Sequence, residues 1–464
     1  MSTSETMEPG AALPATTTGE SAEPRFSVWR SLKIGSFHVG SSLADLLTSA
    51  VWNRLLIVDL GVPAWPVSLL VALRYLLAPL TLWAGHESDT HPLFGSRRVA
   101  YIWIGRLLML LSLPLLPLAL AAIGFDQRSV IGWTLAVTSF MVYGVGTLIS
   151  GAPYLALVYD SAPYARRGQA IAIVQTILVA SFAFGGFLYG RLLPTFNYAQ
   201  FWRLVLFAMA GAAFFWVFSI LGEERRRPAP AGALPSPSLR HTLGEMWMDE
   251  RTRRYAIFLG TSAFFAFMQD AMLEPFGGDV FRLSVGQTTR FNAYWGTGVL
   301  LAMILTTVLT RRWRPEQQVG TTLLGLALLG TPVVLLGVAS ALRMQSLIVP
   351  VLLLFGIGFG VFTVGGVSLL MAMSRPAQAA SYLALWSMVQ LVSRGLGIAM
   401  GGVIRDVALA VTGAFSSAYA TLFIIEGLGL FLCIWLLVRV DVKGFAANQG
   451  TELPAVSALA AAAD

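Results

Sequence analysis

Long apolar runs dominate this chain, separated by short stretches of charged residues, glycine and proline. A helix needs roughly 20 apolar residues to cross a bilayer, and twelve runs of about that length can be distinguished. They cover residues 36–58, 66–84, 99–123, 130–158, 169–190, 204–222, 255–277, 289–309, 319–341, 347–373, 379–403 and 416–438. The pattern therefore predicts an all-α membrane protein with twelve transmembrane helices.

The composition agrees with a membrane location. Hydrophobic residues make up 56% of the 464 residues and charged residues only 12%, whereas a soluble domain carries about 25% charged residues. So few charges leave no way to cover a water-facing surface, which excludes a soluble protein and implies contact with membrane lipids. The net charge of +7 comes almost wholly from arginine, and in a membrane protein such an excess reports orientation rather than nucleic-acid binding.

Lysine and arginine are distributed unevenly between the two sides that the predicted spans define. Twenty fall in the N-terminal tail, the even-numbered loops and the C-terminus, and seven fall in the odd-numbered loops. Because basic residues near span ends are retained in the cytoplasm, we expect both termini to be cytoplasmic. We interpret residues 1–35 as a disordered cytoplasmic tail followed by the entry segment of the first span, and residues 441–464 as a cytoplasmic tail.

The longest internal hydrophilic stretch, residues 223–254, divides the predicted spans six and six. Its proline and alanine content predicts an irregular cytoplasmic connector between an N-terminal six-helix bundle at 36–222 and a C-terminal six-helix bundle at 255–440. Two six-helix halves with a long connector resemble the layout of the major facilitator fold.

The loop between the second and third predicted spans carries a recognisable motif. Its glycines permit tight turns, its aspartate can accept from a helix N-terminus, and its arginines can bind carboxylates or lipid phosphates. The order resembles the loop signature of the major facilitator superfamily, with a longer spacer than most members have. The motif residues are Gly85, Asp89, Gly95, Arg97 and Arg98.

A more specific resemblance extends over about residues 30–125 and continues diffusely to about 440. It is carried by NRLLIVDLGVP at 53–63, LRY at 73–75, GHESDTHPLFGSRR at 85–98 and YIWIG at 101–105. These segments resemble the bacteriochlorophyll delivery family, the PucC and LhaA relatives.

The resemblance implies a factor for assembling light-harvesting antenna complexes in the bacterial inner, photosynthetic membrane. Bacteriochlorophyll would then be bound or delivered as cargo, with antenna polypeptides and pigment synthesis enzymes as partners. Neither the periodicity nor the composition indicates a pigment.

Charged residues inside the predicted spans are costly unless they are paired or hydrated. Asp45 and Arg74 both lie roughly 13–15 Å deep on consecutive antiparallel spans, so we expect them to pair. Asp270 and Arg394 are similarly matched at roughly 10–13 Å from the opposite face. Each pair is explained equally well as a link between helices and as part of a substrate-handling site.

Three further charges lie within or near predicted spans. Arg54 and Arg106 are close enough to opposite faces that we expect them to reach headgroups, or Asp89 in the case of Arg106. Glu426, near the middle of the last span, has no evident partner, which favours its protonated form.

A bacteriochlorophyll magnesium takes a further ligand, commonly an imidazole and less often an amide. His38, Gln269 and Asn53 are the candidates. A headgroup contact explains His38 as well, and interhelical hydrogen bonds explain the two amides.

The sequence shows no catalytic triad, phosphate-binding loop or zinc spacing, and its one cysteine, Cys433, excludes every multi-cysteine metal site. We therefore expect a protein that is not an enzyme and holds no metal of its own. Two alternatives to pigment delivery remain open: a proton-coupled carrier of a small solute and a pigment-free assembly scaffold.

Overall fold

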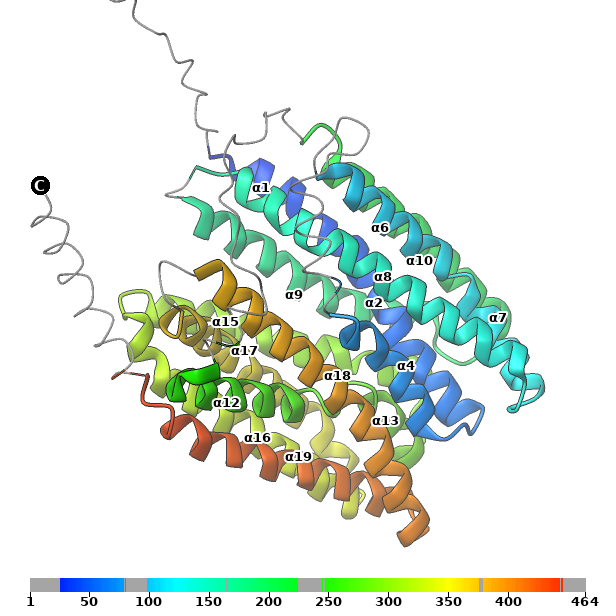
Figure 1. Cartoon of the computed structure of the whole chain (residues 1–464). Helices are drawn as coiled ribbons and strands as arrows, with labels where there is room; N and C mark the ends of the chain where they lie inside the picture. The colour runs from blue at the N-terminus through cyan, green and yellow to red at the C-terminus, as the bar shows by residue number, and fades with distance from the viewer. Residues whose placement is uncertain are drawn as a thin grey trace, which may run out of the picture.

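The computed structural model describes residues 26–78, 80, 98–163, 166–223, 244, 247–374, 379–442 and 444. Every regular element within these ranges is a helix (Figure 1). Nine of the described helices are long and apolar enough to cross a membrane, which confirms the all-α membrane fold. The count of twelve stays a prediction, because the other three predicted spans are segmented or shorter in the described ranges.

The N-terminal half contains the elements up to residue 220. They are α1 (Val28–Gly35), α2 (Phe37–Leu46), η1 (Leu47–Val51), α3 (Trp52–Arg54), η2 (Leu55–Asp59), α4 (Ala64–Leu76), α6 (Val99–Ser112), α7 (Leu115–Phe125), α8 (Val130–Asp160), α9 (Arg167–Leu192) and α10 (Tyr198–Ile220). The first helical path begins at Val28, eight residues before the predicted start of span one at 36, because Ser27 caps it by accepting from the Arg30 backbone N–H.

The C-terminal half contains the elements from residue 250 onward. They are α12 (Glu250–Ala266), α13 (Leu273–Phe281), α14 (Val285–Thr289), α15 (Phe291–Thr310), η4 (Pro315–Gln318), α16 (Val319–Ala341), η5 (Gln345–Leu347), α17 (Ile348–Ala372), α18 (Ala379–Thr412) and α19 (Phe415–Val438). Helix α18 continues well past the predicted end at 403, so Arg405 lies inside a helix rather than in a loop.

The first predicted span of each half is interrupted. In the N-terminal half, the hydroxyls of Thr48 and Ser49 both donate to the Asp45 carbonyl, at 2.9 and 2.8 Å. Such back-bonding competes with the helical ladder, and the helix widens to the π-form η1 at this point. In the C-terminal half, residues 267–272 form turns between α12 and α13. Both interruptions lie beside the predicted charge pairs.

The two halves lie side by side and meet mainly along α4 with α18 and α9 with α15 (Figure 1). Glycines allow the close approach: a Cβ built on Gly402 of α18 would lie 2.8 Å from the Ala64 carbonyl of α4. A Cβ on Gly186 of α9 would lie 2.8 Å from Asn292 Cβ of α15. Small residues therefore set the distance between the halves.

Several hydrogen bonds join the halves near one end of the molecule, which we call the distal end and which contains residues 59–66, 190–200, 281–290 and 405–415. The Trp65 backbone N–H donates to Asp406 at 2.8 Å, and Gly286 donates to the Pro194 carbonyl at 3.3 Å. Arg54 Nη2 reaches the Leu283 carbonyl at 3.0 Å. These contacts hold the halves together at the distal end.

The opposite end, which we call the connector end, carries the start of α1, the end of α10, the start of α12 and the end of α19. Arg30 and Lys33 both bind the Glu223 carboxylate, at 2.6 and 2.8 Å. Arg254 Nη1 donates to the Arg439 carbonyl at 3.3 Å. Both described chain ends therefore lie on one side, whereas their cytoplasmic orientation stays a prediction.

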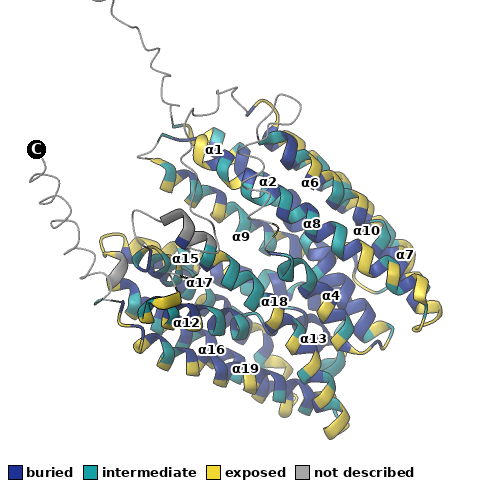
Figure 2. Ribbon diagram, in the orientation of Figure 1, coloured by how far each residue is buried: buried dark blue, intermediate teal, exposed yellow. Residues whose placement is uncertain are grey.

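Exposed residues lie along the outward faces of the peripheral helices (Figure 2), and many of them have large apolar side chains. Phe214 of α10, Leu309 of α15 and Val438 of α19 are 62%, 66% and 66% exposed. Water would not favour such a surface, whereas lipid tails would. The molecule is therefore built to be surrounded by lipid.

Most of the loop motif at 85–98 lies outside the described residues. This applies to Gly85, Asp89, Gly95 and Arg97. Arg98 donates to the Ala156 carbonyl at 2.7 Å and binds the Asp160 carboxylate, both at the end of α8. This arginine therefore fixes the start of α6 to a neighbouring helix.

Candidate functional site

A cavity of about 420 Å³ lies between the two halves. Its wall includes Asp45 and Arg74 from the N-terminal half and Gln269, Asp270 and Arg394 from the C-terminal half. Five of the residues that the sequence analysis singled out thus converge on one space. Their matched depths predicted the two pairs, but not that both pairs face the same cavity.

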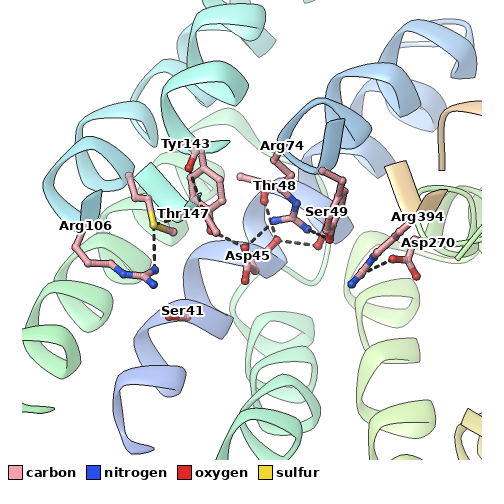
Figure 3. A network of polar contacts seen from close by, with 12 residues as sticks. Ser41, Asp45, Thr48, Ser49, Arg74, Arg106, Tyr143, Thr147, Asp270 and Arg394 are labelled. Atoms are coloured by element: carbon pink, nitrogen blue, oxygen red, sulfur yellow. Dashed lines mark hydrogen bonds and ion pairs between the residues drawn. The ribbon is translucent and has the colours of Figure 1, made fainter. Parts of the chain in front are cut away.

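The first pair joins α2 to α4. Arg74 Nη1 lies 2.7 Å from Asp45 Oδ1, and the Tyr143 hydroxyl of α8 donates to the same oxygen at 2.7 Å (Figure 3). Arg74 Nη2 also donates to the Tyr75 hydroxyl at 2.7 Å. The Asp45 charge is therefore met by both a guanidinium and a phenol, which lowers the cost of placing it inside the membrane.

The second pair joins the turn after α12 to α18. Arg394 Nη2 lies 2.7 Å from Asp270 Oδ2 (Figure 3). The Arg394 guanidinium also lies 3.9 Å from the ring centre of Phe267 and 4.4 Å from that of Tyr75. Arg74 approaches the same Tyr75 ring at 4.7 Å. Tyr75 therefore lies between the two arginines and connects the pairs by cation–π contacts.

Two acceptor oxygens in the cavity wall lack a hydrogen-bond partner among the described residues. They are Oε1 of Gln269, whose amide N–H group donates to the Ala266 carbonyl at 3.2 Å, and Oε2 of Glu274. The other carboxylate oxygen of Glu274 accepts from Asn292 at 2.6 Å. Buried acceptors are normally satisfied, so these two atoms favour a ligand that offers a donor or a hard cation.

Aromatic and aliphatic side chains form most of the remaining wall. Phe359 lies 5.4 Å from Phe267 and 6.1 Å from Trp295 between ring centres, and Trp295 lies 6.3 Å from Phe355. These edge-on contacts fix the rings as a continuous surface. The cavity therefore combines a broad apolar wall with a few polar groups, which is typical of binding sites for amphipathic molecules.

The other two ligand candidates lie away from this cavity wall. Both polar atoms of Asn53 are used: its N–H donates to the Ala271 carbonyl at 2.7 Å, and its oxygen accepts from the Arg54 backbone at 2.8 Å. His38 lies within the first helical path, edge-on to Phe37 and Tyr154 at 5.9 and 5.2 Å between ring centres. Gln269 is thus the one candidate of the three that lines the cavity, and its Oε1 is buried without a hydrogen-bond partner.

The expectation that Arg54 and Arg106 reach headgroups is wrong. Arg54 is 3% exposed and binds Asp59 at 2.7 Å. Arg106 is 5% exposed and lies 4.2 Å from the ring centre of Phe37 and 4.8 Å from that of Trp216. Both side chains turn inward because protein carbonyls, acids and aromatic faces offer closer partners than lipid does.

A third buried pair was missed because Arg405 was assigned to a loop. Arg405 binds Asp279 at 2.5 Å and Asp406 at 2.7 Å, and Tyr419 donates to Asp279 at 2.8 Å. The regular spacing of apolar residues beyond 403 could have revealed that the helix continues. This cluster lies at the distal end, outside the cavity wall. Within the described ranges, no group of three His, Cys, Asp or Glu residues could hold a metal ion.

One family profile and several known proteins are similar to this chain in sequence. The profile of the family described as PUCC protein matches residues 51–445. Protein PucC of Rhodovulum sulfidophilum is 31% identical over 413 residues, covering 86% of this chain and 90% of that protein. The Bacteriochlorophyll synthase 44.5 kDa chain of Rhodobacter capsulatus is 26% identical, covering 78% of this chain and 83% of that protein.

Solved structures similar in shape are membrane transporters. A POT family transporter in complex with a thioalcohol-conjugated peptide superposes with a TM-score of 0.66 at 13% identity, covering 89% of this chain and 96% of that one. An inward-facing bacterial homologue of the human lysosomal transporter Spinster gives 0.65 at 16% identity, covering 91% and 99%. At such identities the likeness establishes the fold alone. The chain therefore belongs to the PucC family and has the major facilitator fold.

Proposed function

We propose that this protein acts in the assembly of light-harvesting antennae by holding bacteriochlorophyll, or handing it over, for antenna polypeptides in the photosynthetic membrane. The observation that carries the proposal is the mostly apolar, aromatic cavity between the halves, whose lining residues Gln269 and Glu274 each have a buried oxygen without a hydrogen-bond partner. Family membership supports it, as does the name of the Bacteriochlorophyll synthase 44.5 kDa chain, the relative from Rhodobacter capsulatus. The protein would act without catalysis, with pigment synthesis enzymes as further partners.

The residues present fit the pigment in kind. Magnesium takes oxygen ligands, and the free oxygen of Gln269 is the candidate to hold it. The rings of Phe267, Trp295 and Phe359 would pack against a macrocycle. A volume of about 420 Å³ lies in the lower part of the range of ligand pockets, about 300–1,000 Å³. It cannot enclose a whole phytylated tetrapyrrole, so the tail would lie outside in lipid.

A carrier of a small solute is the second candidate, and the two ion pairs in the cavity wall favour it. A carrier would bind a polar solute at Arg74 and Arg394, exchanging their carboxylate partners for groups of the solute. The third possibility, a pigment-free scaffold, would leave the cavity without cargo.

One experiment separates these functions. The full chain is expressed in a host that makes bacteriochlorophyll, purified in mild detergent, and examined for pigment by absorption and for antenna polypeptides by mass spectrometry. We expect bound pigment in the natural protein, less in Gln269→Leu, and an unchanged amount in Gln345→Leu, which alters an exposed glutamine far from the cavity.

Protein that captures antenna polypeptides without pigment would support the scaffold. Protein that lacks both and binds a water-soluble solute would support the carrier. Equal pigment in the natural protein and Gln269→Leu would exclude Gln269 as the ligand while leaving the cargo itself intact.

A further inference from the structure

Glu426 is a buried acid that the cavity does not use. It belongs to the stripe of α19 that faces the protein interior, with Leu422 and Phe423 before it and Leu430 after it, and all four residues are 0% exposed. Neither oxygen of its carboxyl group has a hydrogen-bond partner among the described residues. Apolar residues fill the rest of the stripe, so an acid at this position weakens rather than improves the packing.

The surroundings of Glu426 contain more acids than bases. Asp270, at the break between α12 and α13, acts electrostatically on Glu426 and also on Glu274. Arg394 faces this region from α18, but it is bound to Asp270 at 2.7 Å. Arg54 acts on Glu274 and is bound to Asp59 at 2.7 Å. The three acids therefore cannot all be neutralised by the cations that the structure places near them.

The titratable groups on the elements packed against α19 can be named in full. Helix α16 has none, and α12 has them only between Glu250 and Tyr255, at the connector end. Those on α13, α18 and α19 itself are Glu274, Asp279, Tyr382, Arg394, Arg405, Asp406, Tyr419, Glu426 and Cys433. Asp279, Arg405, Asp406 and Tyr419 bind one another at the distal end. Of the cations on these elements, Arg394 binds an acid at the break, Asp270.

An ionised carboxylate without a counter-ion or a hydrogen bond is very unfavourable in the membrane interior. A proton removes this charge, and it is the one ligand that needs no room in a closely packed stripe. Glu274 offers a second position, because it is 2% exposed and its Oε2 is free.

We propose that Glu426, with Glu274 across the break in span seven, forms a proton-binding site beside the Asp270–Arg394 pair. In the conformation described, Glu426 holds a proton, and Asp270 is the one acid that Arg394 binds. When the proton leaves, a second negative charge acts on Asp270, and the pair that closes one side of the cavity loosens. Protons would therefore control the charge of the cavity wall. The site goes beyond pigment handling, and it adjoins the cargo cavity because Glu274 also lines the cavity wall.

Infrared spectroscopy of the purified full chain tests the proposal directly, because a protonated carboxyl group and a carboxylate absorb at different frequencies. We expect a protonated-carboxyl band that persists in alkaline buffer, well beyond the range in which exposed acids ionise. Glu426→Gln, which keeps the shape, should remove part of the band, and Glu426→Gln with Glu274→Gln should remove all of it. Glu250→Gln, at the exposed start of α12, should leave it unchanged.

Labelling of the natural protein provides a measurement that needs no variant. Dicyclohexylcarbodiimide reacts with protonated acids in apolar surroundings, and we expect mass spectrometry to find the adduct on Glu426 or Glu274, with or without sodium. An infrared band that Glu426→Gln does not alter, in protein that still elutes as a single species, would overturn the proposal. A band that appears only when sodium is withdrawn would show a metal cation in the site and would overturn it as well. Neither result would bear on bound pigment.

Discussion

Individual charges in this protein are held by several partners at once. Asp45 of α2 accepts hydrogen bonds from Arg74 of α4 and from Tyr143 of α8. Arg394 binds one carboxylate and contacts two aromatic rings. In hydrocarbon each additional partner replaces hydration that the side chain has lost. Removing one partner therefore leaves the others with an uncompensated group.

The Asp45–Arg74 pair gives the first prediction. Asp45→Asn and Arg74→Gln should each lower the free energy of unfolding, and the double variant should lose less than the sum, with a coupling of about 0.5–3 kcal/mol. The exposed Glu250–Arg254 pair is the control and should couple by only about 0.3–0.5 kcal/mol. Denaturant unfolding in detergent provides the measurement. Strictly additive losses would show that Asp45 and Arg74 do not meet.

The burial of two ion pairs gives the second prediction. Asp279 and Arg405 are 6% and 5% exposed, whereas Asp270 and Arg394 are 23% and 30% exposed at the cavity. Water can reach the second pair but not the first. Asp279→Asn should therefore cost about 3–5 kcal/mol and lower the melting temperature more than Asp270→Asn does. The reverse order would mean that water reaches the distal cluster.

At the scale of helices, the sequence predicted how deep each charged residue lies along the axis of its own helix. The rise per residue gave the depths of Asp45 and Arg74 in the membrane, and the matched depths predicted their pairing. The sequence could not show which helices are neighbours. The convergence of both pairs on Tyr75 was therefore missed, as was the hydrogen bond from Tyr143. Arg405 was misplaced for a simpler reason: a helix end is uncertain by several residues.

The contact between α4 and α18 gives a prediction at this scale. Gly402→Ala places a methyl group 2.8 Å from the Ala64 carbonyl and from Ser68 Cβ, and it should cost about 1–3 kcal/mol by overpacking. Gly366→Ala in α17 is the matched control, because its Cβ would meet nothing within 4 Å. It should leave thermal stability unchanged or raise it by up to about 1 kcal/mol. Equal effects would show that the halves do not depend on this contact.

At the scale of the whole molecule, the connector end and the distal end differ in chemistry. The connector end holds basic residues such as Arg30, Lys33 and Arg254 beside both described chain ends. We predict that this end is cytoplasmic, because loops rich in basic residues are retained on that side of the membrane. Reporter fusions at residues 240 and 460 should both give cytoplasmic signals. A periplasmic signal from either fusion would reverse the orientation.

The assembly role gives a prediction for the living cell. Deleting the gene in a phototrophic host without a second family member should reduce assembled antenna complexes, while pigment synthesis continues. The reason is that the proposed action follows synthesis and needs no catalysis by this chain. Absorption spectra of membranes measure the antennae, and solvent extraction measures total pigment. Normal antenna levels would exclude the proposed function.

The interrupted first span of each half also affects how the protein is made. Neither the path from α1 to η2 nor α12 with α13 is among the nine helices that qualify as spans, and each carries or adjoins an acid that costs about 2.5–3.5 kcal/mol to insert at a helix centre. In the N-terminal half the ribosome adds Arg74, the partner of Asp45, only 29 residues later. The first span can therefore enter the bilayer together with the second as a hairpin. In the C-terminal half Arg394 follows Asp270 by 124 residues. During translation Asp270 therefore stays without its partner until α18 has been made, and we expect the second half to mature more slowly than the first.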